Sequence, residues 1–418
     1  MMIFKKIAPI FFFLTCLTNV FGQTETETNP PFNIKTVAFV QNGNVMIPMF
    51  RLGDPFELQF DDLYGNEADY YYTITQCNYD WTPTQLAKME YLQGMDNQRI
   101  MNYQNSFNTL QIYSHYSLSF PNRFNRITKS GNYIVKVFDS NQELVFSRKF
   151  MLYEENLTIP VQVKRSRDIS TINQMQNLDF VIKTGDNLFQ NPANNIKVVL
   201  LQNGRLDNAI YNIKPQYTIG NDMIYRYNKE TQFWAGNEFL YFENKDIRGV
   251  GNNVLNVTAG EIYNSHLYQH EPRHDKGYTF APDINGNFMI NNRNASNSDL
   301  EADYAWVYFS LSANPFINNQ DIYVNGLFNN YALSDENKME YNKERGIFEK
   351  AVLIKQGFTN YQFVIADKKG KIDYENAVDG NYYQTENNYF VLAYYRGNND
   401  RYDRIIGRGY ANSENITN

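Results

Sequence analysis

The chain has 418 residues and a net charge of −7, with 38 Lys and Arg against 45 Asp and Glu. This balance argues against a nucleic-acid or anionic-membrane surface, since both need clustered cations. One of its two cysteines lies in the leader described next, so an internal disulfide is excluded, and stability must come from burial in two or three domains.

The first 22 residues have the pattern of a secretory signal peptide. Lys5 and Lys6 precede an apolar run that is too short for a transmembrane helix, and we place cleavage after Gly22. Lipidation at Cys16 is an alternative, although Thr15 is an unfavourable residue directly before such a cysteine. The sequence therefore predicts an exported protein.

The composition predicts an all-β fold. The 33 Tyr and 30 Phe favour strands, and the abundant Asn residues favour tight turns. Short alternating runs between Asn-Gly and Asp-Gly turns are typical of β-sandwiches. We expect two or three consecutive immunoglobulin-like β-sandwich domains with few short helices.

Residues 60–94 are the least generic stretch. Alternation over 70–75 predicts a strand that has Tyr70, Tyr72 and Ile74 on one face. A short helix is expected to follow, with Thr82 as N-cap, Pro83 at the first helical position and Gly94 as C-cap. Trp81 is expected to anchor this corner, because a Trp buries a large apolar area.

Two groups in this stretch could do chemistry. Asp61 and Asp62 are adjacent on an expected strand, so their side chains point to opposite faces and do not easily share an acid/base site. Cys77 is a lone thiol without a recognisable His or Asn/Asp arrangement, which favours a buried hydrophobic role over a nucleophile.

Turn signals and alternating runs divide the mature chain into three expected domains. The first spans 32–155 and ends in a hairpin over 131–150. The second spans 157–299 and closes with a polar linker. The third spans 303–409, and Tyr389–Tyr395 is expected to close its sheet.

Three of the four histidines lie four residues apart at His266, His270 and His274. Such spacing would suit a metal on a helix, but Pro272 argues against a helix. In an extended chain residues four apart are about 13 Å from each other, too far to share one ion. Solvated or interface histidines are therefore expected, with no metal or other cofactor.

The third domain contains an order of short motifs that resembles the glycogen- and starch-binding sandwich modules of amylolytic proteins. The motifs are Asp321–Tyr331, Met339–Tyr341 and Gly357–Phe363. Tyr331 stands where those modules have a sugar-stacking Trp, and Trp306 is the one Trp in the domain. The resemblance supports an immunoglobulin-like fold and gives weak support for glycan binding.

A longer series of motifs is similar to the plug-protein family of the type IX secretion system. It comprises Phe60–Leu63, Tyr72–Trp81, Glu90–Gly94, Asn105-Ser106, Asn108-Thr109, Tyr113–Tyr116, Leu118–Asn122, Gly131–Tyr133, Arg148–Met151, Gln202-Asn203, Arg205–Asn208, Gly236–Phe239, Thr385–Tyr389, Tyr394–Arg396 and Arg401–Arg404. One departure is Gln76, where the family more often has His.

This resemblance implies a non-enzymatic periplasmic protein at the inner face of the outer membrane. It would dock on the translocon barrel of the secretion system and seal its periplasmic opening, with no nucleic acid and no small-molecule substrate. The sequence does not say which residues contact the barrel. The alternative is an exported carbohydrate-binding protein that uses the third domain, and an enzyme would need a carboxylate pair that no spacing singles out.

Overall fold

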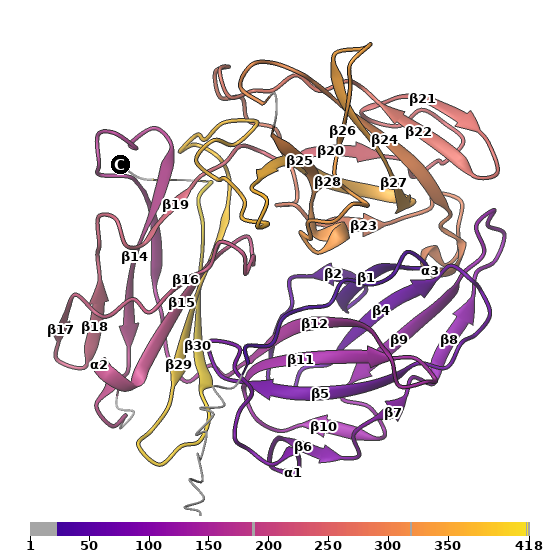
Figure 1. Cartoon of the computed structure of the whole chain (residues 1–418). Helices are drawn as coiled ribbons and strands as arrows, with labels where there is room; N and C mark the ends of the chain where they lie inside the picture. The colour runs from indigo at the N-terminus through magenta and orange to yellow at the C-terminus, as the bar shows by residue number, and fades with distance from the viewer. Residues whose placement is uncertain (1–22, 186–188, 318–319, 415, 417–418) are drawn as a thin grey trace, which may run out of the picture.

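The computed structural model describes residues 23–185, 189–317, 320–414 and 416, so the expected leader and Cys16 lie outside the described residues. The described chain consists mainly of β-strands (Figure 1), which confirms the predicted all-β fold. Its helices are single turns, α1 (Lys88–Tyr91), α2 (Pro192–Asn195), α3 (Ser298–Glu301) and the 3-10 turn η1 (Leu327–Asn329). Among the described residues, no helix has the length and apolar character needed to cross a bilayer.

The first unit, residues 34–154, is a sandwich of two sheets around one core. One sheet has the order β2 (Asn44–Met46), β1 (Ile34–Gln41), β4 (Phe56–Asp62), β9 (Ser114–Phe120) and β8 (Asn102–Asn105). The facing strands are β12 (Leu144–Tyr153), β11 (Gly131–Phe138), β5 (Tyr71–Cys77) and β7 (Gln98–Arg99), with β3 (Met49–Arg51) beside β12; β6 (Leu92–Gly94) and β10 (Asn125–Ile127) form a small ribbon. Aromatic side chains from both sheets fill the core between them.

Two predictions for this unit are confirmed. In β5, Tyr72 and Ile74 are fully buried, whereas the alternate residues on the other face are partly exposed. The expected hairpin is formed by β11 and β12, which pair antiparallel from Gly131 opposite Leu152 to Phe138 opposite Leu144, with one register shift. Local alternation was sufficient in both cases, because one face of each strand meets the aromatic core.

The second unit is built from two separated parts of the chain, residues 157–235 and 388–412. One of its sheets contains β13 (Val161–Arg165), β14 (Met175–Lys183), β18 (Asp222–Tyr225), β17 (Tyr217–Ile219) and β19 (Gln232–Trp234). The other contains β16 (Ile210–Tyr211), β15 (Ile196–Gln202), β29 (Asn388–Tyr395) and β30 (Arg404–Asn412). One strand-pairing position between β30 and β12 of the first unit, Tyr153 opposite Ile405, joins this second sheet to the first unit as one nine-stranded sheet.

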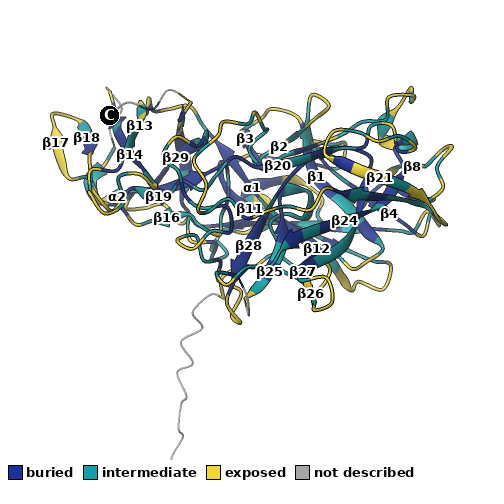
Figure 2. Cartoon of the chain, turned by 90° about the horizontal axis from the view of Figure 1, so that it is seen from above, coloured by how far each residue is buried: buried dark blue, intermediate teal, exposed yellow. Residues whose placement is uncertain are grey.

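The third unit, residues 239–380, is again a sandwich with its own core. One side has β20 (Leu240–Glu243), β28 (Gly357–Ala366), β23 (Phe288–Ile290) and β25 (Asp321–Asn325). The other side has β21 (Val254–Ala259), β22 (Tyr263–Leu267), β24 (Tyr304–Ser312), β27 (Ile347–Lys355) and β26 (Glu340–Asn342). Seen from above (Figure 2), the three units form an elongated body whose buried strands are surrounded by exposed loops.

The strand pairing does not follow the domain boundaries expected from the sequence. The prediction that Tyr389–Tyr395 closes the sheet of the third domain is wrong, because β29 pairs with β15 and β30. β20 lies inside the expected second domain, 157–299, but it pairs with β28 and so belongs to the third unit. We therefore propose the division into 34–154, 157–235 with 388–412, and 239–380. Nearly every residue of β29 is buried, so its own pattern does not indicate a partner.

The helix expected from Thr82 to Gly94 is also wrong, since only the single turn α1 is helical in this stretch. Asp80 accepts hydrogen bonds from the backbone and hydroxyl of Thr82, so the expected cap is part of a polar turn instead. Pro83 forms a bridge to Cys77, and Gly94 pairs with Asn125. The polar side chains of this corner thus form hydrogen bonds within a turn, and they do not cap a helix.

Candidate functional site

A buried polar cluster joins the first and third units around Asp61. Its Oδ2 lies 2.7 Å from Nζ of Lys355 on β27 and accepts a 2.6 Å hydrogen bond from the hydroxyl of Tyr304 on β24. Its Oδ1 lies 2.7 Å from Nδ1 of His115 on β9. The side chains of Asp61 and Lys355 are 1% and 2% exposed, so this ion pair is shielded from water.

The partners of Asp61 decide its charge state. Burial raises the pKa of this carboxyl, but the attraction of Lys355 and the hydrogen bond and charge of His115 outweigh burial and hold the pKa below its ordinary value. Asp62 has separate partners, the hydroxyl of Tyr70 and the amide of Asn33, each at 2.9 Å. The two carboxylates therefore have separate sets of partners, as expected for adjacent strand residues whose side chains point to opposite faces. Their contacts fit a structural role.

Cys77 and Trp81 belong to a core cluster that spans the first and second units. Cys77 is fully buried, and burial raises the pKa of its thiol to about 12, which confirms the buried hydrophobic interpretation. Trp81 is 5% exposed and lies under the ammonium of Lys149, as expected for an anchor. Gln76, at the position of the family difference, donates from its amide to the hydroxyl of Tyr133.

The three spaced histidines each have their own neighbours. His266 stacks on Tyr308 with ring centroids 4.5 Å apart, and His274 stacks on Phe316 at 4.2 Å. His270 forms a 2.7 Å contact with the carboxylate of Asp379. Within the described ranges, no group of three or more His, Cys, Asp or Glu could hold a metal ion.

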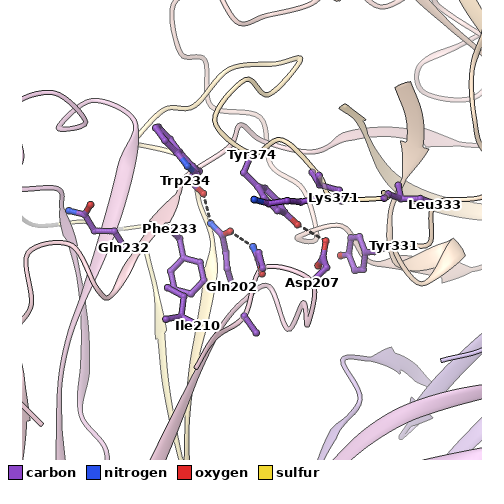
Figure 3. A pocket seen from close by; sticks show the side chains of 14 residues that line it. Gln202, Asp207, Ile210, Gln232, Phe233, Trp234, Tyr331, Leu333, Lys371 and Tyr374 are labelled. Atoms are coloured by element: carbon purple, nitrogen blue, oxygen red, sulfur yellow. Dashed lines mark hydrogen bonds between the residues drawn. The ribbon is translucent and has the colours of Figure 1, made fainter. Parts of the chain in front are cut away.

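A cleft of about 550 Å³ lies between the second and third units (Figure 3). Gln202 and Trp234 come from the second unit, and Tyr331, Lys371 and Tyr374 come from the third. The amide of Gln202 donates to the backbone oxygen of Trp234 at 3.0 Å. The lining thus combines amides and aromatic rings with the charged side chains of Asp207 and Lys371.

One side of this cleft is tied together by Arg205. Its guanidinium donates to both oxygens of Asp207, at 3.0 and 2.7 Å, and lies 4.4 Å from the ring centroid of Tyr331. The hydroxyl of Tyr374 donates to the same carboxylate. Burial raises the pKa of Asp207, but the guanidinium outweighs burial, so the pKa lies below its ordinary value. The motif Arg205–Asn208, noted in the sequence, thus bridges two units.

This arrangement bears on the expected sugar contact at Tyr331. Stacking on a sugar requires an open aromatic ring, whereas the Tyr331 ring is covered by Arg205 and half-buried. The structure therefore does not support the sugar-binding alternative. Sequence reasoning could not find this, because Arg205 is far from Tyr331 in the chain.

The geometry defines a protein of stacked β-sandwiches whose candidate sites are contacts between units. The profile of the family described as type 9 secretion system plug protein, first domain, matches residues 34–154. A crystal structure of a hypothetical protein from Parabacteroides merdae is 32% identical, with a TM-score of 0.87, and the match covers 93% of this chain and 100% of that chain. No curated protein matches the chain.

The protein belongs to the type IX secretion system plug family, and the match begins and ends at the bounds of the first unit. This family is a secretion-system plug family and not an enzyme family. Membership in it indicates that the protein has a role associated with the secretion machinery. The resemblance noted in the sequence is therefore confirmed at this level.

Proposed function

We propose that the protein is a periplasmic plug that docks on the outer-membrane translocon barrel of the type IX secretion system. It covers the periplasmic opening when no cargo passes, and it does so without catalysing a reaction. On this proposal the protein is exported by a cleavable signal peptide and lies against the inner face of the outer membrane. The family match and the whole-chain similarity support its association with this machinery.

The observation that carries the proposal is that polar side-chain contacts tie each pair of units together, and that two of these contacts are buried. Asp61 and Lys355 join the first unit to the third. The hydroxyl of Tyr394 in the second unit donates to Asn132 in the first at 2.8 Å, and both residues are buried. The Asp207–Tyr374 contact joins the second unit to the third.

Rigid coupling is what a stopper needs. A domain of about 100 residues has a radius of gyration of about 13 Å, so three coupled sandwiches cover a wide opening. If the units moved independently, the opening would leak whenever one of them rotated. Because each unit is bonded to the other two, rotation of any one unit is opposed.

The test is affinity purification of the tagged full-length protein from its native envelope. We expect the outer-membrane translocon barrel, identified by mass spectrometry, to co-purify in near-equal amount, and a tagged unrelated periplasmic protein to recover none. Deleting the gene should make the outer membrane permeable to a large antibiotic that is normally excluded. An intact tagged protein that recovers no barrel, with unchanged permeability after deletion, would refute the proposal.

A further inference from the structure

The loop that joins β8 to β9, residues 106–113, exposes large apolar side chains. Phe107 is 70% exposed, Leu110 54% and Ile112 58%, and Tyr64 in the neighbouring turn is 67% exposed. The turn and the loop are in contact, because a Cβ on Gly65 would lie 3.2 Å from Ile112. We call Tyr64, Phe107, Leu110 and Ile112 the apolar tip. Figure 2 shows β8 at one end of the elongated body, among exposed loops.

The third unit holds the backbone of this loop in place. The buried carboxylate of Asp303 accepts hydrogen bonds from the backbone N–H of Leu110 at 2.7 Å and of Gln111 at 3.0 Å. The N–H of Phe107 donates to the oxygen of Leu300 at 2.9 Å. The hydroxyl of Tyr113 donates to the oxygen of Ala302 at 2.9 Å.

Bonds inside the loop add to this support. The N–H of Ser106 donates to the oxygen of Tyr113 at 2.8 Å, and the N–H of Tyr113 donates back to the Ser106 hydroxyl at 3.0 Å. The backbone is thus fixed while the apolar side chains point to solvent. A loop ordered in advance loses less conformational entropy on binding, which favours a contact surface over a mobile connection.

The charge pattern indicates the chemistry of the partner. Residues 100–122 contain no Asp, Glu, Lys or Arg, in a chain of which 20% is charged. The residues between the apolar ones are Asn108, Thr109 and Gln111, which can form hydrogen bonds without carrying charge. Depletion of charge with enrichment of aromatic side chains is typical of the centre of protein interfaces. A surface that binds anionic lipid would instead carry Lys and Arg.

We propose that the apolar tip is the docking surface of this protein and that it inserts into an uncharged, apolar pocket on the wall of the translocon barrel. This proposal rests on the proposed function, because that function supplies the partner. Fixed apolar side chains then act as anchors, and the surrounding amides and hydroxyls form the polar rim. Asp303 is a positioning residue for this surface and does not itself meet the partner.

The test compares two triple variants of the tagged full-length protein in its native envelope. The tip variant carries Phe107→Ser, Leu110→Ser and Ile112→Ser. The control variant carries Ile169→Ser, Ile219→Ser and Val250→Ser, which removes three exposed apolar side chains from elsewhere on the surface. We expect barrel recovery to fall at least about tenfold for the tip variant and to stay unchanged for the control. Both variants should keep the wild-type melting temperature, since the replaced side chains are exposed.

A photo-crosslinking residue gives a second readout that does not depend on affinity. Placed at Phe107 it should crosslink to the barrel, and placed at Ile169 it should not. Equal barrel recovery by the tip variant and the wild type would overturn the docking surface while leaving the proposed function intact. Failure of the wild type itself to recover the barrel would instead refute the proposed function. Flotation with zwitterionic vesicles that is lost only in the tip variant, with unchanged barrel recovery, would also overturn the proposal, because the tip would then bind lipid.

Discussion

Asp61 and Lys355 lie 294 positions apart in the chain, yet their side chains form a 2.7 Å ion pair from which water is almost completely excluded. The pair contacts Tyr304 and His115 as well, so both charges are satisfied within the protein. Such a pair contributes little net stability compared with apolar residues, but losing one partner is costly. It therefore fixes how the first unit meets the third.

Replacing Lys355 by Met should lower the free energy of unfolding by about 3–5 kcal/mol, because Asp61 is left as an unpaired buried charge. Adding Asp61→Asn should recover part of this loss. Urea denaturation of the single and double variants measures the coupling. Arg345→Ala is the control, since its pair with Glu349 is exposed and should contribute less than about 1 kcal/mol. Equal losses for Lys355→Met and Arg345→Ala would contradict the prediction.

Replacing Trp81 by Ala should cost about 3–5 kcal/mol, as is usual for a large buried aromatic side chain. Trp81 packs in the cluster between the first and second units, so both units should unfold at a lower temperature. Trp306→Ala is the matched control, because that ring is half-buried against Phe32 and should cost less. Calorimetry measures the melting temperatures of both variants. A wild-type melting temperature for Trp81→Ala would show that the corner around Trp81 does not contribute to the stability of the fold.

The sequence predicted strands whose pattern depends on neighbouring residues in the chain. It did not predict pairings between residues that are far apart in the chain. Alternation placed β5 correctly, because its core face and its outer face leave a period of two. It also placed the β11–β12 hairpin, although the second face of that hairpin is partly covered by the second unit. The pairing of β29 was missed, because a strand buried on both faces has the same pattern beside any partner. Asp61 was recognised as a candidate, but its pairing with Lys355 has no local signal.

Contacts with distant residues also explain why the helix expected within residues 78–94 is not formed. Its Thr, Pro and Gly are good helix boundary residues, yet tertiary contacts at Gln76 and Asn125 determine the backbone there. The absence of charged residues over 100–122 can be read from the sequence, but the exposure of Phe107, Leu110 and Ile112 cannot. The backbone of this loop is held by hydrogen bonds to Asp303, and Asp303 lies in another unit.

Gly94→Ala should destabilise the first unit by about 2–4 kcal/mol. Its φ is +107°, and an added Cβ would lie 2.1 Å from the backbone oxygen of Phe124, which is too close for any side chain. Gly346→Ala is the control, because its φ of +64° is also left-handed but an added Cβ meets nothing within 4 Å. It should cost about 1 kcal/mol. Urea midpoints that are equal for the two variants would refute the steric argument.

Asp283 should make stability fall as pH rises. Burial, with added repulsion from Glu238 and Glu386, raises the pKa of Asp283 to about 7, whereas the unfolded chain ionises near 3.8. The folded state therefore holds more protons between these values, and stability present below pH 3.8 is lost as pH rises through 7. Asp283→Asn should flatten the decline in melting temperature between pH 5 and 8. Asp367→Asn should leave it unchanged, because the pKa of that exposed carboxyl is lowered. Parallel profiles for wild type and Asp283→Asn would show that another group governs the decline.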